Sequence, residues 1–184
     1  MPVTVPLDQD GAFWLFGYGS LIHRPDVPWI ARTPARLHGW SRRFWQGSHD
    51  HRGLPEAPGR VVTLIRAPDA VCAGMAYRIP SRERDQVLAR LDHREKNGYE
   101  REQVRLEIGA GETLDALVYI APPGNFAWLG PADDHAIAWQ IAHAEGPSGR
   151  NRDYLLELAA ALAALAAEDP HVEDLAARVR ALIP

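Results

Sequence analysis

Apolar residues alternate with polar ones in the middle of the chain and recur at helical spacing towards its end. Val104, Leu106 and Ile108 alternate with polar and charged residues, which is typical of a half-buried strand. Residues 114–121 form a mostly apolar run of strand length. This pattern therefore predicts β-structure in the middle of the chain.

Two more strands are expected earlier in the chain. Residues 61–65 and 71–79 are mostly apolar, and Pro68–Asp69 between them is typical of a turn. Residues 43–60 contain three glycines, two prolines and little periodicity. We expect a loop there that is long enough to be functional. Residues 1–10 are polar and contain proline, which predicts a loose lead-in to the fold.

One helix is expected within this β-rich part. Ser81 is a suitable N-cap for a helix that runs to about Asp92, because the apolar residues between them recur at helical spacing. Asn97–Gly98 then ends the helical pattern. Glu95 is therefore expected just past the end of this helix, at the entry to a turn.

The last third of the chain is rich in alanine and predicts helices. Pro131 is placed to begin a helix that Gly146 ends. Asn151 is a suitable N-cap for a second helix, and Asp169–Pro170 begins a third. Apolar residues share one face of each of the last two helices, which predicts packing against a core rather than a cofactor role. Strands with one helix, followed by three helices, predict an α+β fold.

Length and composition are ordinary for a soluble globular protein. At 184 residues, with 46% hydrophobic and 24% charged residues, we expect a single domain over residues 1–184. The net charge of -4 gives no indication of a nucleic-acid partner. The sequence has no apolar run of membrane-spanning length and no signal-peptide pattern at its N-terminus. The single cysteine, Cys72, excludes an internal disulfide. We therefore expect a cytoplasmic protein. The sequence leaves its oligomeric state unknown.

The segment after the apolar run Phe13–Leu15 has the composition of a tight turn. Apolar and aromatic residues on both sides predict a strand that breaks into the turn and then resumes. Its two glycines allow backbone conformations that side chains forbid and leave N–H groups bare, which suits a carboxylate or a developing oxyanion. Most Gly-x-Gly turns at strand ends are only turns, so the segment alone does not establish a site. Its residues are Gly17, Tyr18, Gly19, Ser20, Leu21 and Ile22.

Several common active-site signatures are absent from the sequence. Ser20 is not in a nucleophile elbow, because neither flanking position of the Gly-x-Ser-x-Gly motif holds glycine. The same turn lacks the third glycine of a dinucleotide-binding fingerprint. Cys72 lies in an apolar stretch and is expected in the core. His49 and His51 stand without a further metal-ligand motif, so we predict no metal site and no cofactor.

Six segments follow one another along the chain: FGYGSLI from Phe16, GWSRRFWQGSHDHRG from Gly39, GRVVTL from Gly59, LDHREKNGYER from Leu91, ALVYIA from Ala116 and GPSGRNRDYL from Gly146. Together they resemble the ChaC-type γ-glutamylcyclotransferases, which cleave glutathione, and the resemblance runs over nearly the whole chain. The chain departs from the family pattern at His23, where we expect tryptophan. This difference bears on the shape of one pocket wall rather than on the chemistry.

The resemblance implies a fold and a reaction. The fold is a curled mixed sheet, nearly a small barrel, with the helices around it. In the reaction, the free α-amine of a γ-glutamyl group attacks its own γ-carbonyl, closes 5-oxoproline and expels cysteinylglycine. No covalent intermediate with the protein is needed, which agrees with the absence of a nucleophile motif.

The resemblance also implies roles for particular residues. It places the catalytic general acid and base on Glu95 and the γ-glutamyl group on residues 17–22. We expect partial burial to raise the pKa of the Glu95 carboxyl, and we expect Arg94 and Lys96 to point away from it. If one substrate touches both sites, the Glu95 carboxylate has to lie within about 4–8 Å of the turn, in a shared pocket.

The remaining assignments stay open at the level of sequence. Tyr99 and Tyr154 are secondary candidates, each divided between a pocket and a core position. Residues 45–48 are placed to shape the side that receives the leaving peptide. The sequence leaves two alternatives to a glutathione enzyme: a cyclotransferase for other γ-glutamyl amides, and a catalytically silent binding domain of the same fold. Glu95 favours an enzyme, because a silent relative could lose this carboxylate.

Overall fold

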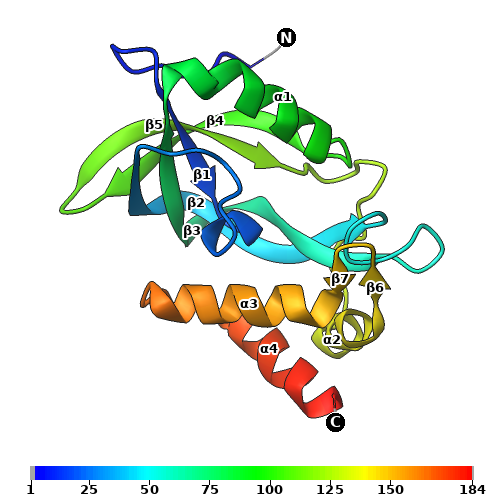
Figure 1. Ribbon diagram of the computed structural model, residues 1–184. Helices are drawn as coiled ribbons and strands as arrows, with labels where there is room; N and C mark the ends of the chain where they lie inside the picture. Colours follow the sequence, from blue (N-terminus) through cyan, green and yellow to red (C-terminus); the bar gives the residue numbers. More distant parts are fainter. Residues whose placement is uncertain (1–2, 184) are drawn as a thin grey trace. The chain divides into compact units, whose positions relative to one another are not determined.

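A closed five-stranded barrel forms the β-structure of the computed structural model, which describes residues 3–183 (Figure 1). Its strands lie in the order β1-β3-β2-β4-β5. β1 is antiparallel to β3 and parallel to β5, so the sheet is mixed. The predicted curled, barrel-like mixed sheet is therefore confirmed. The strands are β1 (Phe13–Gly17), β2 (Ala31–Ser48), β3 (Gly59–Ile79), β4 (Glu100–Ile108) and β5 (Glu112–Ile120).

Helices fill the C-terminal third, as predicted, and the fold is α+β. No helix within residues 3–183 is long and apolar enough to span a membrane. The α-helices are α1 (Arg84–Arg94), α2 (Asp134–His143), α3 (Asn151–Ala164) and α4 (Pro170–Leu182). Shorter elements are the 3₁₀ turns η1 (Ser20–Ile22) and η2 (Ser81–Glu83) and the strands β6 (Glu145–Gly146) and β7 (Gly149–Arg150), which pair with each other.

The chain divides into two compact units. Unit 1 comprises residues 1–41 and 66–120, and unit 2 comprises residues 42–65 and 121–184. Strands β2 and β3 contribute residues to both units, so neither unit is a continuous segment. That one domain spans the chain stays a prediction.

In unit 1, α1 lies against the β4–β5 hairpin (Figure 1). Its apolar residues Val87, Leu88 and Leu91 are buried, which stabilises the fold by roughly 1.5–3 kcal/mol for each side chain. Asp92, which follows Leu91 in α1, accepts hydrogen bonds from Arg101 of β4 and from the hydroxyl of Tyr119 of β5. These contacts fix the C-terminal end of α1, where Glu95 follows.

In unit 2, helices α2, α3 and α4 pack against one another, and the sequence predicts apolar packing faces for the last two. The Asp169 carboxylate caps α4 by accepting from the backbone N–H of Val172, as expected for an Asp-Pro start. Asp169 also forms an ion pair with the fully buried Arg42. Most of the predicted core face of α3 and α4 is confirmed, since its members Leu155, Leu158, Leu162, Val172, Leu175 and Val179 are buried. Leu165 and Leu182, at the C-terminal ends of the same two faces, are only half-buried.

Two strand predictions are wrong. Pro68–Asp69 is not a turn, because β3 runs without interruption from Gly59 to Ile79. Both residues are exposed. A proline lacks the backbone N–H that donates within a sheet, and this loss is tolerated where the strand faces solvent. The predicted loop over residues 43–60 is also too long, since β2 continues to Ser48 and only residues 49–58 connect it to β3.

Three helix starts differ from the prediction. Ser81 opens the 3₁₀ turn η2, and α1 begins only at Arg84. Asp133, not Pro131, starts α2, because its carboxylate accepts from two backbone N–H groups of the first turn. Asn151 is the first residue of α3 rather than its cap. Its buried amide instead exchanges two hydrogen bonds with the backbone of Arg60, at 2.7 and 2.8 Å.

Candidate active site

The Gly17–Ile22 segment begins where β1 ends, and it does not resume as a strand. Ser20–Ile22 forms the 3₁₀ turn η1, closed by hydrogen bonds from the Ile22 N–H to the Gly19 carbonyl (3.0 Å) and from the His23 N–H to the Ser20 carbonyl (3.2 Å). The first N–H groups of a helical turn have no partner within it. The 3₁₀ turn itself therefore leaves the N–H groups of Ser20 and Leu21 without a partner inside it; that they bind an anion stays a prediction.

Gly17 is required by packing rather than by an unusual backbone conformation. A Cβ atom at Gly17 would lie 2.7 Å from the Leu21 Cβ, closer than real Cβ contacts allow. Neither Gly17 nor Gly19 has a positive φ; Gly19 has φ -125°. The expectation that these glycines adopt conformations closed to other residues is met at Gly19, whose φ of -125° and ψ of -127° lie outside the helical and extended regions, whereas Gly17 has no positive φ. Gly17 instead lets η1 fold back closely onto the end of β1.

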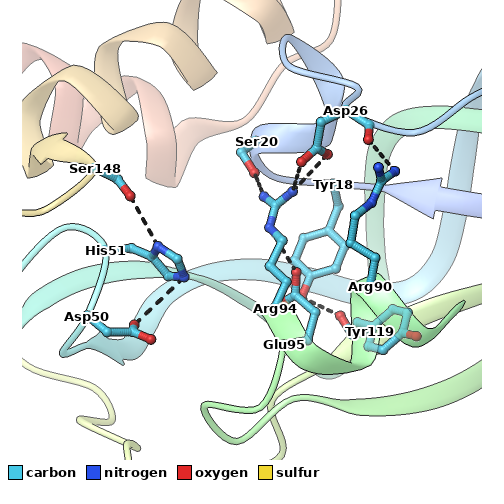
Figure 2. Close-up of polar contacts among 10 residues, drawn as sticks. All are labelled: Tyr18, Ser20, Asp26, Asp50, His51, Arg90, Arg94, Glu95, Tyr119 and Ser148. Atoms are coloured by element: carbon cyan, nitrogen blue, oxygen red, sulfur yellow. Dashed lines mark hydrogen bonds and ion pairs between the residues drawn. The ribbon is translucent and has the colours of Figure 1, made fainter. Parts of the chain in front are cut away.

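Two tyrosine hydroxyls hold this segment to the rest of unit 1. The buried Tyr18 donates to the backbone carbonyl of Tyr119 in β5 (2.8 Å; Figure 2). Tyr77 of β3 donates to the carbonyl of Leu21 (2.6 Å). Burial raises the pKa of the Tyr77 phenol, so the hydroxyl stays protonated and remains a donor. The turn is thus anchored on both sides of Ser20.

Glu95 lies where the sequence predicts, directly after α1. Its N–H donates to the Leu91 carbonyl (2.8 Å), and its own carbonyl accepts from Tyr99 (3.2 Å). Gly98, with φ +93°, permits the turn between these residues. The Glu95 side chain is 19% exposed, so the carboxylate is partly shielded and still within reach of a substrate.

Arg94 joins Glu95 to the turn, which corrects the expectation that it points elsewhere. Its Nε lies 3.4 Å from Glu95 Oε1, and its Nη2 donates to the Ser20 hydroxyl at 2.7 Å (Figure 2). Its Nη1 donates to both carboxylate oxygens of Asp26, at 2.9 and 3.0 Å. One guanidinium thus brings together two segments that are remote in sequence. Lys96, in contrast, is exposed.

The other residues that the sequence analysis considered for a functional role are mostly buried. Tyr154 is a core residue: it is buried, and its ring meets that of Phe44 edge-on at 6.0 Å. Tyr99 is half-buried, and its role stays a prediction. In the stretch 45–48, Gln46 and Ser48 are buried and hydrogen-bonded within unit 2, so their action on a leaving peptide also stays a prediction. Cys72 is buried, as expected of a core thiol.

A second polar cluster lies in unit 2 and consists of Asp50, His51 and Ser148. His51 Nδ1 lies 3.1 Å from the Ser148 hydroxyl, and its Nε2 lies 3.9 Å from Asp50 Oδ1 (Figure 2). Within the described chain, no group of three or more His, Cys, Asp or Glu residues is placed to hold a metal ion, and this includes His49 and His51.

Sequence reasoning missed two residues of the site, Asp26 and Tyr77. Asp26 orients Arg94, and Tyr77 holds Leu21, but neither belongs to a recognisable motif. The contact from Asp26 to Arg94 spans 68 positions and that from Tyr77 to Leu21 spans 56. Only the folded barrel brings these residues together.

Comparison with known proteins gives consistent matches over most of the chain. A family model described as ChaC-like protein matches residues 13–182. Gamma-glutamylcyclotransferase 2-3 of Arabidopsis thaliana is 46% identical over 94% of this chain and 90% of its own. Glutathione-specific gamma-glutamylcyclotransferase 1 of Homo sapiens is 39% identical over 94% of this chain and 81% of its own.

A solved structure matches the fold as well. The crystal structure of a γ-glutamyl cyclotransferase specific to glutathione from yeast has a TM-score of 0.87 and 33% sequence identity. The match covers 92% of this chain and 96% of the yeast chain. The likeness therefore includes both the barrel strands and the C-terminal helices.

Proposed function

The chain belongs to the ChaC-like family, and we propose that it is a γ-glutamylcyclotransferase that cleaves glutathione to 5-oxoproline and cysteinylglycine. The relatives named for glutathione support this substrate. The observation that carries the proposal is the Arg94 guanidinium, which contacts both the Glu95 carboxylate and the Ser20 hydroxyl and so links Glu95 to the Gly17–Ile22 turn.

The reaction follows from the substrate's own groups. The α-amine of the γ-glutamyl group attacks the γ-carbonyl, and a new C–N bond closes the five-membered ring. The tetrahedral intermediate collapses, the original amide C–N bond breaks, and the nitrogen of cysteinylglycine takes up a proton. Holding the glutamyl chain curled gives this intramolecular attack its proximity advantage.

We assign the proton transfers to Glu95. Its carboxylate takes a proton from the attacking ammonium and returns one to the leaving nitrogen, so that it acts first as a base and then as an acid. Partial shielding of the side chain, which is 19% exposed, supports this role, because limited access of water favours direct transfer to the substrate. A raised pKa of the Glu95 carboxyl stays a prediction.

We assign substrate binding to the Gly17–Ile22 turn. The N–H groups of Ser20 and Leu21 are suited to the α-carboxylate or the developing oxyanion, since backbone donors fixed before the reaction stabilise such charge. The two tyrosine anchors support this assignment because they hold the turn in place without a ligand. Ser20 adds a hydroxyl that Arg94 orients.

The test is the incubation of purified protein with glutathione and the quantification of 5-oxoproline and cysteinylglycine. We expect turnover without added metal or nucleotide and in the presence of a strong chelator. Parallel assays with γ-glutamyl-alanine and a γ-glutamyl amine distinguish a glutathione enzyme from one for other γ-glutamyl amides. Absence of product from every substrate indicates the silent binding domain instead. A cytoplasmic location belongs to the same proposal, because the cytosol is the glutathione-buffered compartment.

A further inference from the structure

The guanidinium of Arg94 directs each of its three nitrogens to a different group. Nη1 faces the Asp26 carboxylate at 2.9 and 3.0 Å, Nη2 faces the Ser20 hydroxyl at 2.7 Å, and Nε faces the Glu95 carboxylate at 3.4 Å (Figure 2). The Arg94 side chain is 29% exposed, so these interactions are only partly screened by water.

These contacts link the two halves of the site. Ser20 belongs to the turn after β1, whereas Glu95 follows α1, 75 positions further along the chain. Tyr18 and Tyr77 anchor the turn to strands of the barrel. Arg94 contacts the turn and the Glu95 carboxylate at once, so its conformation influences the spacing between the turn and the carboxylate.

We infer that Arg94 is a positioning residue for the reaction, which sets Glu95 relative to the substrate-binding turn and is itself held by Asp26. The inference rests on the proposed function, in which Glu95 transfers protons and the turn binds the γ-glutamyl group. A displacement of about 1 Å between a catalytic group and its substrate can lower a rate by about 100-fold. Arg94 therefore controls the catalytic step more than substrate affinity.

The side-chain chemistry explains why an arginine stands here. A guanidinium is a rigid planar fork with donors on three nitrogens, so it can contact three groups in fixed directions. A lysine ammonium keeps the charge but is a single point at the end of a flexible stem. It can satisfy Asp26 or Glu95, but it cannot reproduce the bridge.

Asp26 has a separate part in this arrangement. It receives both hydrogen bonds from Nη1 and also pairs through its backbone carbonyl with Arg90, one turn earlier in α1. By binding the outer end of the guanidinium, Asp26 keeps Arg94 from turning fully onto Glu95. A full ion pair there would hold the base in its ionised form and occupy the oxygens that the substrate needs.

The main test compares kcat and KM for glutathione in Arg94→Lys, Arg105→Lys, Glu95→Gln and the wild-type protein. We expect Arg94→Lys to lower kcat by about 10- to 100-fold with a change in KM below about threefold. Arg105→Lys is the matched control, because the exposed Arg105 donates from two nitrogens to a carboxylate, that of Asp115, outside the candidate site. We expect this control to stay within about twofold of wild type. A kcat of Arg94→Lys within twofold of wild type, or a loss confined to KM, overturns the inference.

A rescue experiment separates positioning from folding. Methylguanidinium added to Arg94→Ala is expected to restore kcat at least fivefold while leaving the wild-type rate unchanged. Failure of rescue with a normal thermal unfolding curve contradicts a positioning role. If wild type itself forms no 5-oxoproline, the proposed function fails. If wild type is active, Glu95→Gln is inactive and Arg94→Lys is normal, only the inference about Arg94 fails.

Discussion

The two polar clusters drawn in Figure 2 use similar chemistry but are built differently. Asp50, His51 and Ser148 have the residue types of a hydrolytic triad. The His51 and Asp50 side chains are 49% and 39% exposed, although the Oδ1 atom of Asp50 is itself shielded from solvent. The distance from His51 Nε2 to Asp50 Oδ1 is 3.9 Å, beyond a hydrogen bond. A histidine that is not oriented by its carboxylate lacks the fixed tautomer that triad chemistry requires.

The cluster around Arg94 lacks any familiar triad and is nevertheless the better-organised one. Glu95 is mostly shielded, and its neighbour Arg94 has partners at 2.7 to 3.4 Å in three directions. The turn that it contacts is anchored twice more by tyrosine hydroxyls. The comparison teaches that fixed orientation, and not the list of residue types, distinguishes a candidate catalytic site from a surface network.

The largest expected effect comes from Glu95→Gln. Glutamine keeps the shape and polarity of the side chain but cannot transfer a proton, so we expect kcat to fall by about 10²–10⁴-fold. Substrate binding, measured by calorimetry with glutathione, is expected to remain. Glu100→Gln removes an exposed carboxylate at the start of β4 and is the matched control. Equal activity of the two variants would sink the assignment of Glu95.

Gly17→Ala is expected to have the next largest effect. The added Cβ would meet Leu21 Cβ at 2.7 Å and push η1 away from β1, so we expect kcat/KM to fall by about tenfold or more. Gly111→Ala is the control, because it strains a backbone with φ +87° but meets no atom within 4 Å. That variant lowers stability and leaves turnover unchanged. Activity loss in proportion to the drop in Tm for both variants would argue against a site effect.

The local sequence pattern predicts the elements whose residues lie close together in the chain. The alternation at Val104, Leu106 and Ile108 corresponds to β4, and the Asp169–Pro170 start corresponds to α4. The pattern fails where a distant partner decides. Pro68–Asp69 remains inside β3, whose length follows from pairing around the barrel.

The same distinction holds for the candidate site. The Gly-Tyr-Gly turn and Glu95 are found from their motifs, but how they are joined is not. From sequence, Arg94 next to Glu95 suggests a charge that should turn away to keep the carboxyl pKa high. Asp26 and Ser20 instead occupy most of the guanidinium, which leaves only its Nε edge for Glu95. Such a division of one charge among three partners depends on tertiary structure.

A smaller effect is expected for the cluster in unit 2. We expect His51→Ala and Ser148→Ala each to change kcat/KM for glutathione by less than about threefold, because an exposed, loosely oriented network contributes little. Steady-state kinetics under the conditions used for Glu95→Gln measures this directly. A loss of 100-fold or more in both variants would mean that the cluster takes part in the chemistry, so that fixed orientation does not distinguish the Arg94 cluster from it.

The smallest expected effect is on stability. It concerns His171, a histidine of unit 2 whose ring is held in one orientation, unlike the ring of His51. His171 Nε2 accepts a hydrogen bond from the backbone N–H of Phe44 (3.1 Å), which requires that nitrogen to be unprotonated. Burial, with a smaller contribution from Arg43, lowers the pKa of His171 below its ordinary value of 6.5. The unfolded chain therefore binds a proton more readily than the folded protein.

It follows that the stabilising contribution of His171 is fully present above pH 6.5 and is lost as the pH falls towards the lower pKa of the folded state. Urea unfolding between pH 8 and pH 5 is expected to show a falling free energy of unfolding in wild type. In His171→Gln the amide oxygen can accept from Phe44 without titrating, so this part of the pH dependence disappears. If the free energy of unfolding of the variant falls with pH as steeply as that of wild type, the acid sensitivity comes from other groups. The fixed hydrogen bond of His171 would then contribute nothing measurable to the pH dependence of stability.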